Sequence, residues 1–86
     1  MATHISAEKR HRQSLRRRSR NRLIKGAVRT AAKDVRVAYE KKDPELKEIL
    51  RRAERTIAKA AAKGVLDKKA ASRSISRLAS LVASAR

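Results

Sequence analysis

The hydrophobic residues of this 86-residue chain recur at spacings of three and four, which is the period of an α-helix. The first such pattern lies in a proline-free segment that runs to Lys42, and Ser6 is a suitable N-cap for its start. We therefore predict one helix of roughly 35 residues, preceded by a frayed end at residues 1–5. Its apolar stripe covers only the second half and consists of Leu23, Ile24, Val28, Ala31, Val35 and Ala38.

A second amphipathic helix follows the first after a short connection. Asp43 can cap it and Pro44 suits its first position, because the residue before a proline is biased out of the helical region. We expect this helix to run from Pro44 to about Lys63 and to end at Gly64 in a left-handed cap, with apolar Val65 behind it. Glu48 should pair with Arg52 one turn later. The stripe of this helix is Leu46, Ile49, Leu50, Ala53, Ile57, Ala60 and Ala61.

A third helix of about eighteen residues should follow Asp67, which is placed to cap it. Because both connections are short, consecutive helices should be antiparallel neighbours. The second helix then folds back along the first as far as residue 22, and what precedes that point projects about 20–25 Å beyond it. The prediction is an all-α fold, an antiparallel three-helix bundle with a long N-terminal helix whose first half overhangs the bundle. The third stripe is Ala71, Ile75, Leu78, Val82 and Ala85.

Charge changes the picture of the overhanging half. Residues 9–22, KRHRQSLRRRSRNR, contain eight Lys or Arg, no Asp or Glu, and only Leu15 as a sizeable apolar side chain. Such a run repels itself unless a dense polyanion opposes it, and the net charge of the whole chain is +17. We divide the single domain, residues 1–86, into a basic arm (residues 7–22) and a bundle (residues 23–86). The cations of the basic arm surround the helix. This arrangement suits insertion between several phosphate strands of folded RNA better than contact with one duplex.

Several classes of function are excluded by composition. The chain has no cysteine, and His4 and His11 have no partners at metal-ligand spacing. It also lacks paired carboxylates, a nucleophile with a base, and a glycine-rich phosphate loop, so we expect no enzyme, cofactor, metal or small-molecule substrate. No apolar run is long enough for a membrane span or a secretion signal, so we expect no membrane contact. The lack of cysteine fits the reducing environment of a cytoplasmic protein. Tyr39, the only aromatic residue, is expected in the core, so recognition should rest on backbone and shape.

Other polar positions have two interpretations. The outer face of the long helix continues the charge through Arg29, Lys33 and Arg36, and the third helix presents Lys69, Arg73 and Arg77 opposite its apolar stripe. Both sets suit either a solvated face or contact with phosphate. The same two readings hold for Ser14, Ser19, Asn21 and Thr30.

Two stretches, SAEKRHRQSLRRRSRNRLIKGAVRTAAKDV and AAKGVLDKKAASRSISRLA, resemble the bacterial small-ribosomal-subunit protein S20 family in order and spacing. The resemblance covers nearly the whole chain. It implies a three-helix bundle with a long basic helix that binds 16S ribosomal RNA directly and supports subunit assembly and translation in the ribosome. The positions that match the family pattern are Lys9, Arg10, Gln13, Arg17, Arg18, Asn21, Arg22, Arg29, Thr30, Lys63, Gly64, Lys68, Ala71, Arg73, Ser76, Arg77 and Leu78. The RNA-binding residues that we predict are the polar and charged ones Lys9, Arg10, Arg12, Gln13, Arg16, Arg17, Arg18, Arg20, Asn21, Arg22, Lys25, Arg29, Thr30, Lys33, Lys63, Lys68, Lys69, Arg73 and Arg77.

The chain departs from the family pattern in the second stretch. Asp67-Lys68-Lys69 stands where the family usually has His-Lys-Asn, which removes any contact made by that histidine. Ile75 occupies a common lysine position and Ser72 a common alanine position, so we expect Ile75 to contribute packing. Other small-subunit proteins are possible partners, and no homo-oligomer is expected.

Two other hypotheses compete with a ribosomal function. A nucleoid-type or linker-histone-like protein would bind any duplex DNA with equal affinity. A membrane-active basic helix would need an apolar face opposite its arginines, and residues 9–22 have none.

Overall fold

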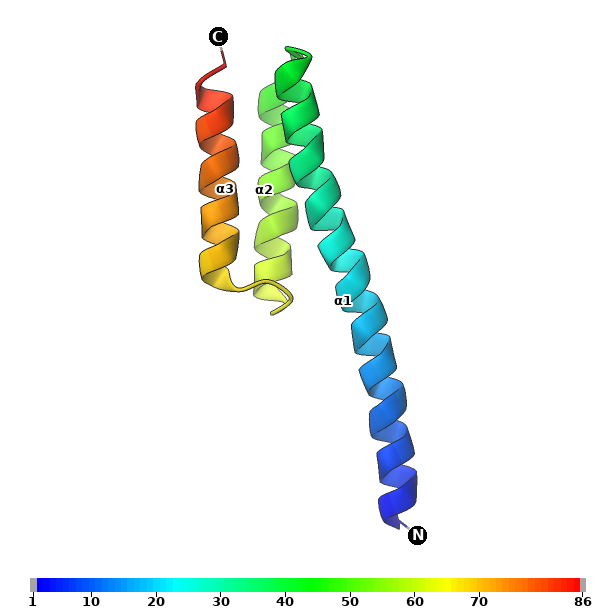
Figure 1. The fold of residues 1–86 in the computed structure, drawn as a ribbon. Helices are drawn as coiled ribbons and strands as arrows, with labels where there is room; N and C mark the ends of the chain where they lie inside the picture. Colours follow the sequence, from blue (N-terminus) through cyan, green and yellow to red (C-terminus); the bar gives the residue numbers. More distant parts are fainter. Residues whose placement is uncertain (1, 86) are drawn as a thin grey trace.

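The computed structural model describes residues 2–85, and the side chains of residues 6–85, as three helices joined by short turns. The helices are α1 (Ala2–Glu40), α2 (Leu46–Ala62) and α3 (Lys68–Ala83). Each runs antiparallel to the next, and α2 packs against both of the others, whereas α1 and α3 touch each other less (Figure 1). Within the described part of the chain there is no strand. The predicted all-α, antiparallel three-helix bundle is confirmed.

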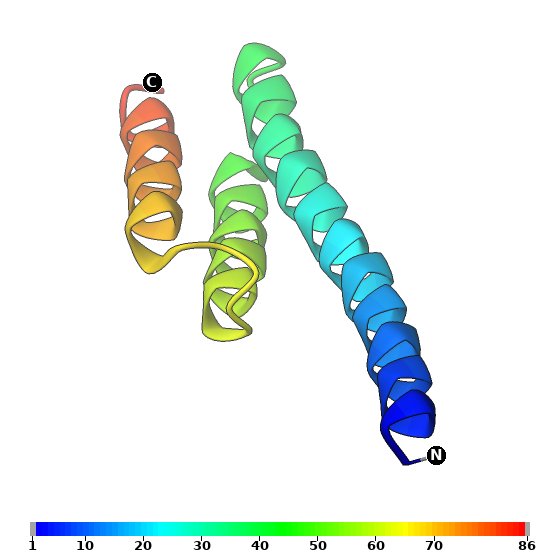
Figure 2. The ribbon, with the colours of Figure 1, turned by 60° about the horizontal axis from the view of Figure 1, so that its bottom comes forward.

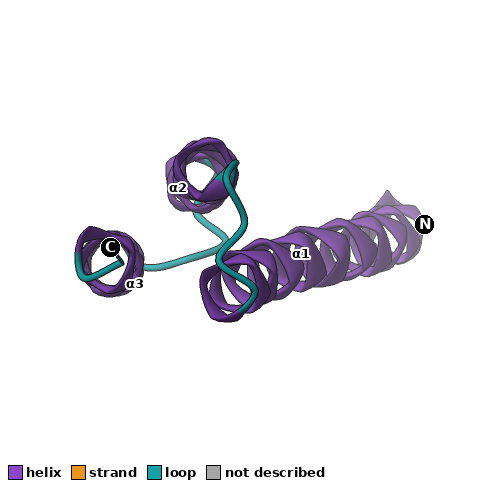
Figure 3. Cartoon of the chain, turned by 90° about the horizontal axis from the view of Figure 1, so that it is seen from above, coloured by secondary structure: helices purple, strands orange, loops and turns teal. Residues whose placement is uncertain are grey.

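The first half of α1 overhangs the bundle. With 39 residues, α1 is about 58 Å long, and the molecule measures 66 × 22 × 14 Å along its principal axes. Figures 1 and 2 show this half extending well past the turn between α2 and α3. Figure 3 shows that α1 is also inclined to the other two helices, so its N-terminal half moves away from them. Every residue from Ser6 to Arg20 is exposed, and the predicted overhang is confirmed.

The start of α1 differs from the prediction. The helix begins at Ala2, so Ser6 lies inside it and does not cap it, and residues 2–5 belong to the helix instead of a frayed end. No glycine or proline occurs among these residues, and extending an existing helix costs far less than starting one. A serine can serve as the N-cap, and so mark the start of a helix, only where the backbone before it is not helical.

α1 ends in a left-handed cap at a lysine. Lys42 has φ 54°, and the N–H of Asp43 donates to the carbonyl of Ala38 at 2.9 Å. The N–H of Lys42 donates to the carbonyl of Tyr39 at 3.2 Å. This pair of bonds is the Schellman motif, which usually places glycine at the left-handed position. The sequence pattern did not predict it at Lys42.

α2 ends in the same motif, here at the predicted glycine. Gly64 has φ 77°, and its N–H donates to the carbonyl of Ala61 at 3.0 Å. The N–H of Val65 donates to the carbonyl of Ala60, also at 3.0 Å. The left-handed cap at Gly64, with Val65 behind it, is therefore confirmed.

The two N-termini inside the bundle have different N-cap residues. Asp43 does not cap α2 as predicted, because the N-cap position of α2 is held by Glu45, which makes no side-chain capping bond. Asp43 Oδ1 instead accepts a hydrogen bond from the N–H of Glu45 at 2.8 Å within the turn. α2 begins at Leu46, two residues later than predicted, because Leu46 N–H bonds to Asp43 O across three residues. Asp67 holds the N-cap position of α3 as predicted, with extended backbone, but its carboxylate makes no capping bond. Pro44 therefore lies in the turn before α2.

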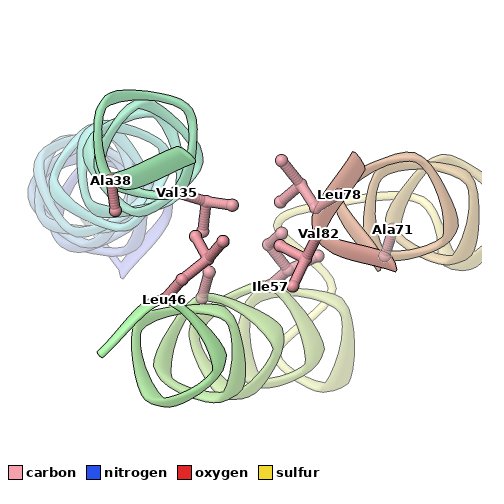
Figure 4. Close-up of a cluster of buried hydrophobic side chains, with 8 residues drawn as sticks. Val35, Ala38, Leu46, Ile57, Ala71, Leu78 and Val82 are labelled. Carbon is pink, nitrogen blue, oxygen red and sulfur yellow. The ribbon is translucent and has the colours of Figure 1, made fainter. Parts of the chain in front are cut away.

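The core is formed where the three apolar stripes meet. Val35 of α1 and Ile57 of α2 are fully buried, and Figure 4 shows them facing Leu78 and Val82 of α3. Tyr39 is partly buried and packs against this cluster, which confirms its predicted core position. Partly buried residues against the same cluster include Val28, Ile49, Leu50, Ala61 and Ile75. Among the described side chains no buried residue is polar or charged.

Two stripe assignments are wrong. Leu23 is 75% exposed, because it lies about 120° around the helix from Val35, whereas half-buried Ile24 lies only about 20° away. Ala85 is exposed because α3 ends at Ala83. On the surface of α2, Glu48 pairs with Arg51 at 3.8 Å instead of Arg52.

Candidate nucleic-acid interface

The basic arm is an exposed helical segment that continues directly from a packed one. Arginine, lysine, glutamine and leucine are good helix formers, and the second half of α1 fixes the axis that the arm follows. Arg17 lies five full turns before buried Val35 and shares its direction, so it projects on the side of α1 that faces the bundle. Arg22 lies about 140° from that direction. The arm therefore presents cations both toward the concave side of the molecule and away from it.

Neighbouring arm residues line shallow hollows on the helix surface, and two of these hollows each contain several predicted RNA-binding residues. Gln13 lies together with three arginines in the first, which is lined by Gln13, Arg16, Arg17 and Arg20. The second reaches from the arm onto the bundled half of α1 and is lined by Arg18, Asn21, Arg22, Lys25, Gly26 and Arg29. Asn21 is half-buried, and it alone among the predicted RNA-binding residues is not exposed.

The outer face of α1 joins the arm to the bundle without a break in charge. Six cations recur at spacings of three and four along about 27 Å of helix, which places each beside the next. All of them are exposed, and the second hollow shows that members of both halves lie side by side. The six are Arg18, Arg22, Lys25, Arg29, Lys33 and Arg36.

The predicted residues of the second sequence block lie elsewhere. Lys63 and Lys68 flank the turn between α2 and α3, at the end of the bundle from which the arm projects (Figure 1). The positive end of the α3 dipole adds to their charge. Lys69, Arg73 and Arg77 are exposed on α3, opposite buried Leu78 and its stripe. The structure thus divides the cations between α1, the end of the bundle, and the outer face of α3.

Some positions that match the family pattern stabilise the fold and are not candidates for RNA contact. Ala71 and Leu78 are each 4% exposed in the core, and Gly64 occupies the left-handed turn. Leu23, conversely, was assigned to the core and is exposed at the base of the arm. Its angular distance from Val35 is the signal that could have shown this.

The described residues give no sign of other site chemistry. Residues 2–85 contain no cluster of His, Cys, Asp or Glu that could hold a metal ion. In the same part of the chain, no helix combines the length and apolar character needed to cross a membrane.

Comparison with protein families gives a match across nearly the whole chain. The model of the family described as "Ribosomal protein S20" matches residues 2–83. That range includes all three helices and every predicted RNA-binding residue.

Curated relatives agree with the family match. The chain is 52% identical over 84 residues to "Small ribosomal subunit protein bS20" of Anaeromyxobacter sp. (strain K), covering 96% of this chain and 92% of the relative. It is 54% identical over 79 residues to the protein of that name from Syntrophus aciditrophicus (strain SB), covering 91% and 89%. For Nitratidesulfovibrio vulgaris (strain DP4) the identity is 46% over 83 residues, covering 95% of each.

Proposed function

The chain belongs to the ribosomal protein S20 family, and from this premise we propose that it binds 16S ribosomal RNA directly as a structural part of the bacterial small ribosomal subunit. Members of this family are ribosomal structural proteins and not enzymes. The protein then works in the cytoplasmic ribosome, where it supports subunit assembly and translation. Its partners are 16S RNA and neighbouring small-subunit proteins.

The observation that supports direct RNA binding best is the exposure of the arm. Its eight cations lie on a helix that projects from the bundle (Figure 1). The 100° step between successive helical residues distributes them around the helix axis. Folded RNA brings several phosphate strands close together, whereas a duplex offers one convex surface, so an all-round cationic rod complements folded RNA better. Arginine adds forked donors that match phosphate oxygens in pairs.

We assign the bundle a positioning role in this function. The packing of α2 against the second half of α1 sets the direction in which the arm leaves the domain. Lys63 and Lys68 at the arm-side end, and Arg73 and Arg77 on α3, would contact further RNA segments only when the arm has its correct angle. Phosphate contacts fix register and orientation in this way without reading bases.

A competition between two nucleic acids tests the proposal. Affinity for either should fall steeply with salt, by roughly 10³–10⁵ between 50 and 200 mM on the duplex-DNA scale, so salt dependence alone decides nothing. Filter binding at one fixed salt concentration should instead show tighter binding to folded 16S RNA than to duplex DNA of equal length. Changing Arg73 and Arg77 together to Glu should reduce that preference. Equal affinity of the intact protein for both would favour a general DNA-binding function.

A further inference from the structure

Leu23 is the most exposed large hydrophobic residue among the described side chains. It is 75% exposed, against 48% for Leu15. A single exposed leucine is ordinary on a protein surface and by itself indicates nothing. Leu23 is unusual because of its place, at the junction where α1 leaves the bundle and becomes the arm.

On one side of Leu23 lies the cationic surface of the arm. Arg20 precedes it by three residues and Arg16 by seven, so both lie on the same face of α1 as Leu23. These two arginines line the hollow that also contains Gln13. The position therefore adjoins groups that would hold the phosphates of a bound strand.

On the other side of Leu23 a groove begins between α1 and α2. Ala27, one turn after Leu23, lines this groove, whose volume is ≈ 630 Å³, within the usual range of small-ligand sites. Its walls combine the small apolar residues Ala31 and Ala53 with the cations Lys33 and Arg52. Leu23 thus lies between the cationic surface of the arm and a groove of mixed charge, on a continuous path along one face of α1.

We propose that Leu23 makes the apolar contact of the RNA interface, against the base of one unpaired nucleotide of 16S RNA, with Arg16 and Arg20 holding the flanking phosphates. The inference rests on the proposed function, and it adds that the RNA next to Leu23 contains an unpaired nucleotide. An A-form duplex offers phosphates and 2′-hydroxyls to a protein, whereas only an unstacked nucleotide offers an apolar face. The chain has no exposed aromatic ring for such a face, since Tyr39 packs against the core.

The occupant of this position is RNA because of its charge surroundings. Arg16 and Arg20 are the cations that share this face of the arm with Leu23. The groove that begins one turn beyond Leu23 has a charged lining of Lys33, Lys41 and Arg52 with the acids Asp34 and Asp43. A second copy of this strongly basic chain would bring like charges together here. A phosphate strand would neutralise them.

Leu23→Ala is the test, because alanine keeps the helix propensity and removes only the exposed side chain. We expect the affinity for 16S RNA to fall by about 5- to 30-fold, which is the effect of leaving most of a leucine side chain unburied. The slope of log affinity against log salt should stay unchanged, because no phosphate contact is lost. Arg20→Gln, in contrast, should reduce the slope by about 0.7–0.9.

Leu15→Ala is the matched control on the same arm. It should change the affinity by less than Leu23→Ala, because Leu15 lies about 80° away around the helix and does not adjoin the groove. Thermal unfolding of the free Leu23→Ala protein should match that of the wild type. An equal loss of affinity in both variants would overturn the assignment of one contact at the junction.

Chemical probing of unpaired bases in the bound RNA gives the second measurement. An unpaired nucleotide protected by the wild-type protein should become reactive with Leu23→Ala and stay protected with Leu23→Met. Identical patterns for all three proteins would overturn the inference, as would a Leu23-dependent dimer of the free protein in sedimentation equilibrium. A wild-type chain without preference for 16S RNA overturns the proposed function as well. A wild-type chain with that preference, matched by Leu23→Ala at every salt concentration, overturns only the Leu23 contact.

Discussion

The two halves of α1 have the same secondary structure and are held by different forces. Between Ala31 and Ala38 the helix buries its stripe against α2 and α3, with Val35 fully buried. Between Ser6 and Arg20 every residue is exposed, and the side chains are mostly like-charged. Most helical stability in proteins comes from packing of an amphipathic face, so the arm lacks the main source of stability that the other half has. In the free protein the helix is stabilised from one end only.

This contrast also explains where the acidic residues lie. Six of the eight acids fall between Asp34 and Glu54, and residues 9–22 contain none. Acids near α2 compensate its cations, as the Glu48–Arg51 pair illustrates, although an exposed pair of this kind adds little stability. The arm keeps its charge uncompensated, which costs stability in the free protein and favours association with a polyanion.

The largest predicted effect is the unfolding of the bundle, which holds the second half of α1 in place. Ile57 is fully buried at the centre of the core, so Ile57→Asp would place an unpaired charge there at a cost of several kcal/mol, enough to unfold a domain this small. Far-UV circular dichroism should show loss of the helical signal. Ala58→Asp, at the next and exposed position, is the control and should keep the fold. A helical spectrum for Ile57→Asp would show that the core assignment is wrong.

The next prediction separates the arm from its base. A peptide of residues 1–25 retains the cations of the arm but loses the contacts that set its direction. We expect it to keep salt-sensitive, non-specific binding and to lose preference for folded 16S RNA over duplex DNA. Competition filter binding of peptide and intact protein at the same salt concentration measures this. A peptide with the full preference would show that the bundle does not position the arm.

A third prediction compares the two halves within the free protein. Amide hydrogen exchange should be fast in residues 9–20 and slow in α2, because local opening costs little where no apolar surface is buried. Binding of 16S RNA should slow exchange in residues 9–20 more than in α2. Equal protection of the two segments in the free protein would contradict the comparison.

Periodicity and charge predicted most of the fold, and the errors have local causes. Gly64 could be predicted as a left-handed cap because glycine adopts positive φ at low cost, whereas Lys42 has no such signal. Leu23 follows the spacing of its stripe locally, but only its angle relative to Val35 shows that it leaves the buried face. The cations of the candidate site were identifiable individually. Their division between α1, the arm-side end and α3 required the packing of three helices, which a linear pattern does not contain.

The smallest predicted effect compares the two left-handed caps, both of which belong to the packed half of the molecule. A residue other than glycine in this left-handed conformation destabilises the folded state by about 1–2 kcal/mol, which a change to glycine would remove. Glycine also lowers the free energy of the unfolded chain, because it has more backbone freedom there, and this offsets about 0.4–1 kcal/mol of the stabilisation. Lys42 is exposed, so Lys42→Gly should raise the free energy of unfolding by roughly 0.5 kcal/mol. That gain corresponds to a Tm increase of about 2–4 °C. Gly64→Ala should have the opposite sign. No atom lies within 4 Å of a Cβ built at Gly64, so that loss would come from the backbone conformation alone. Thermal unfolding of both variants measures the two changes in Tm. A lower Tm for Lys42→Gly than for the wild type would contradict the assignment of strain to this cap.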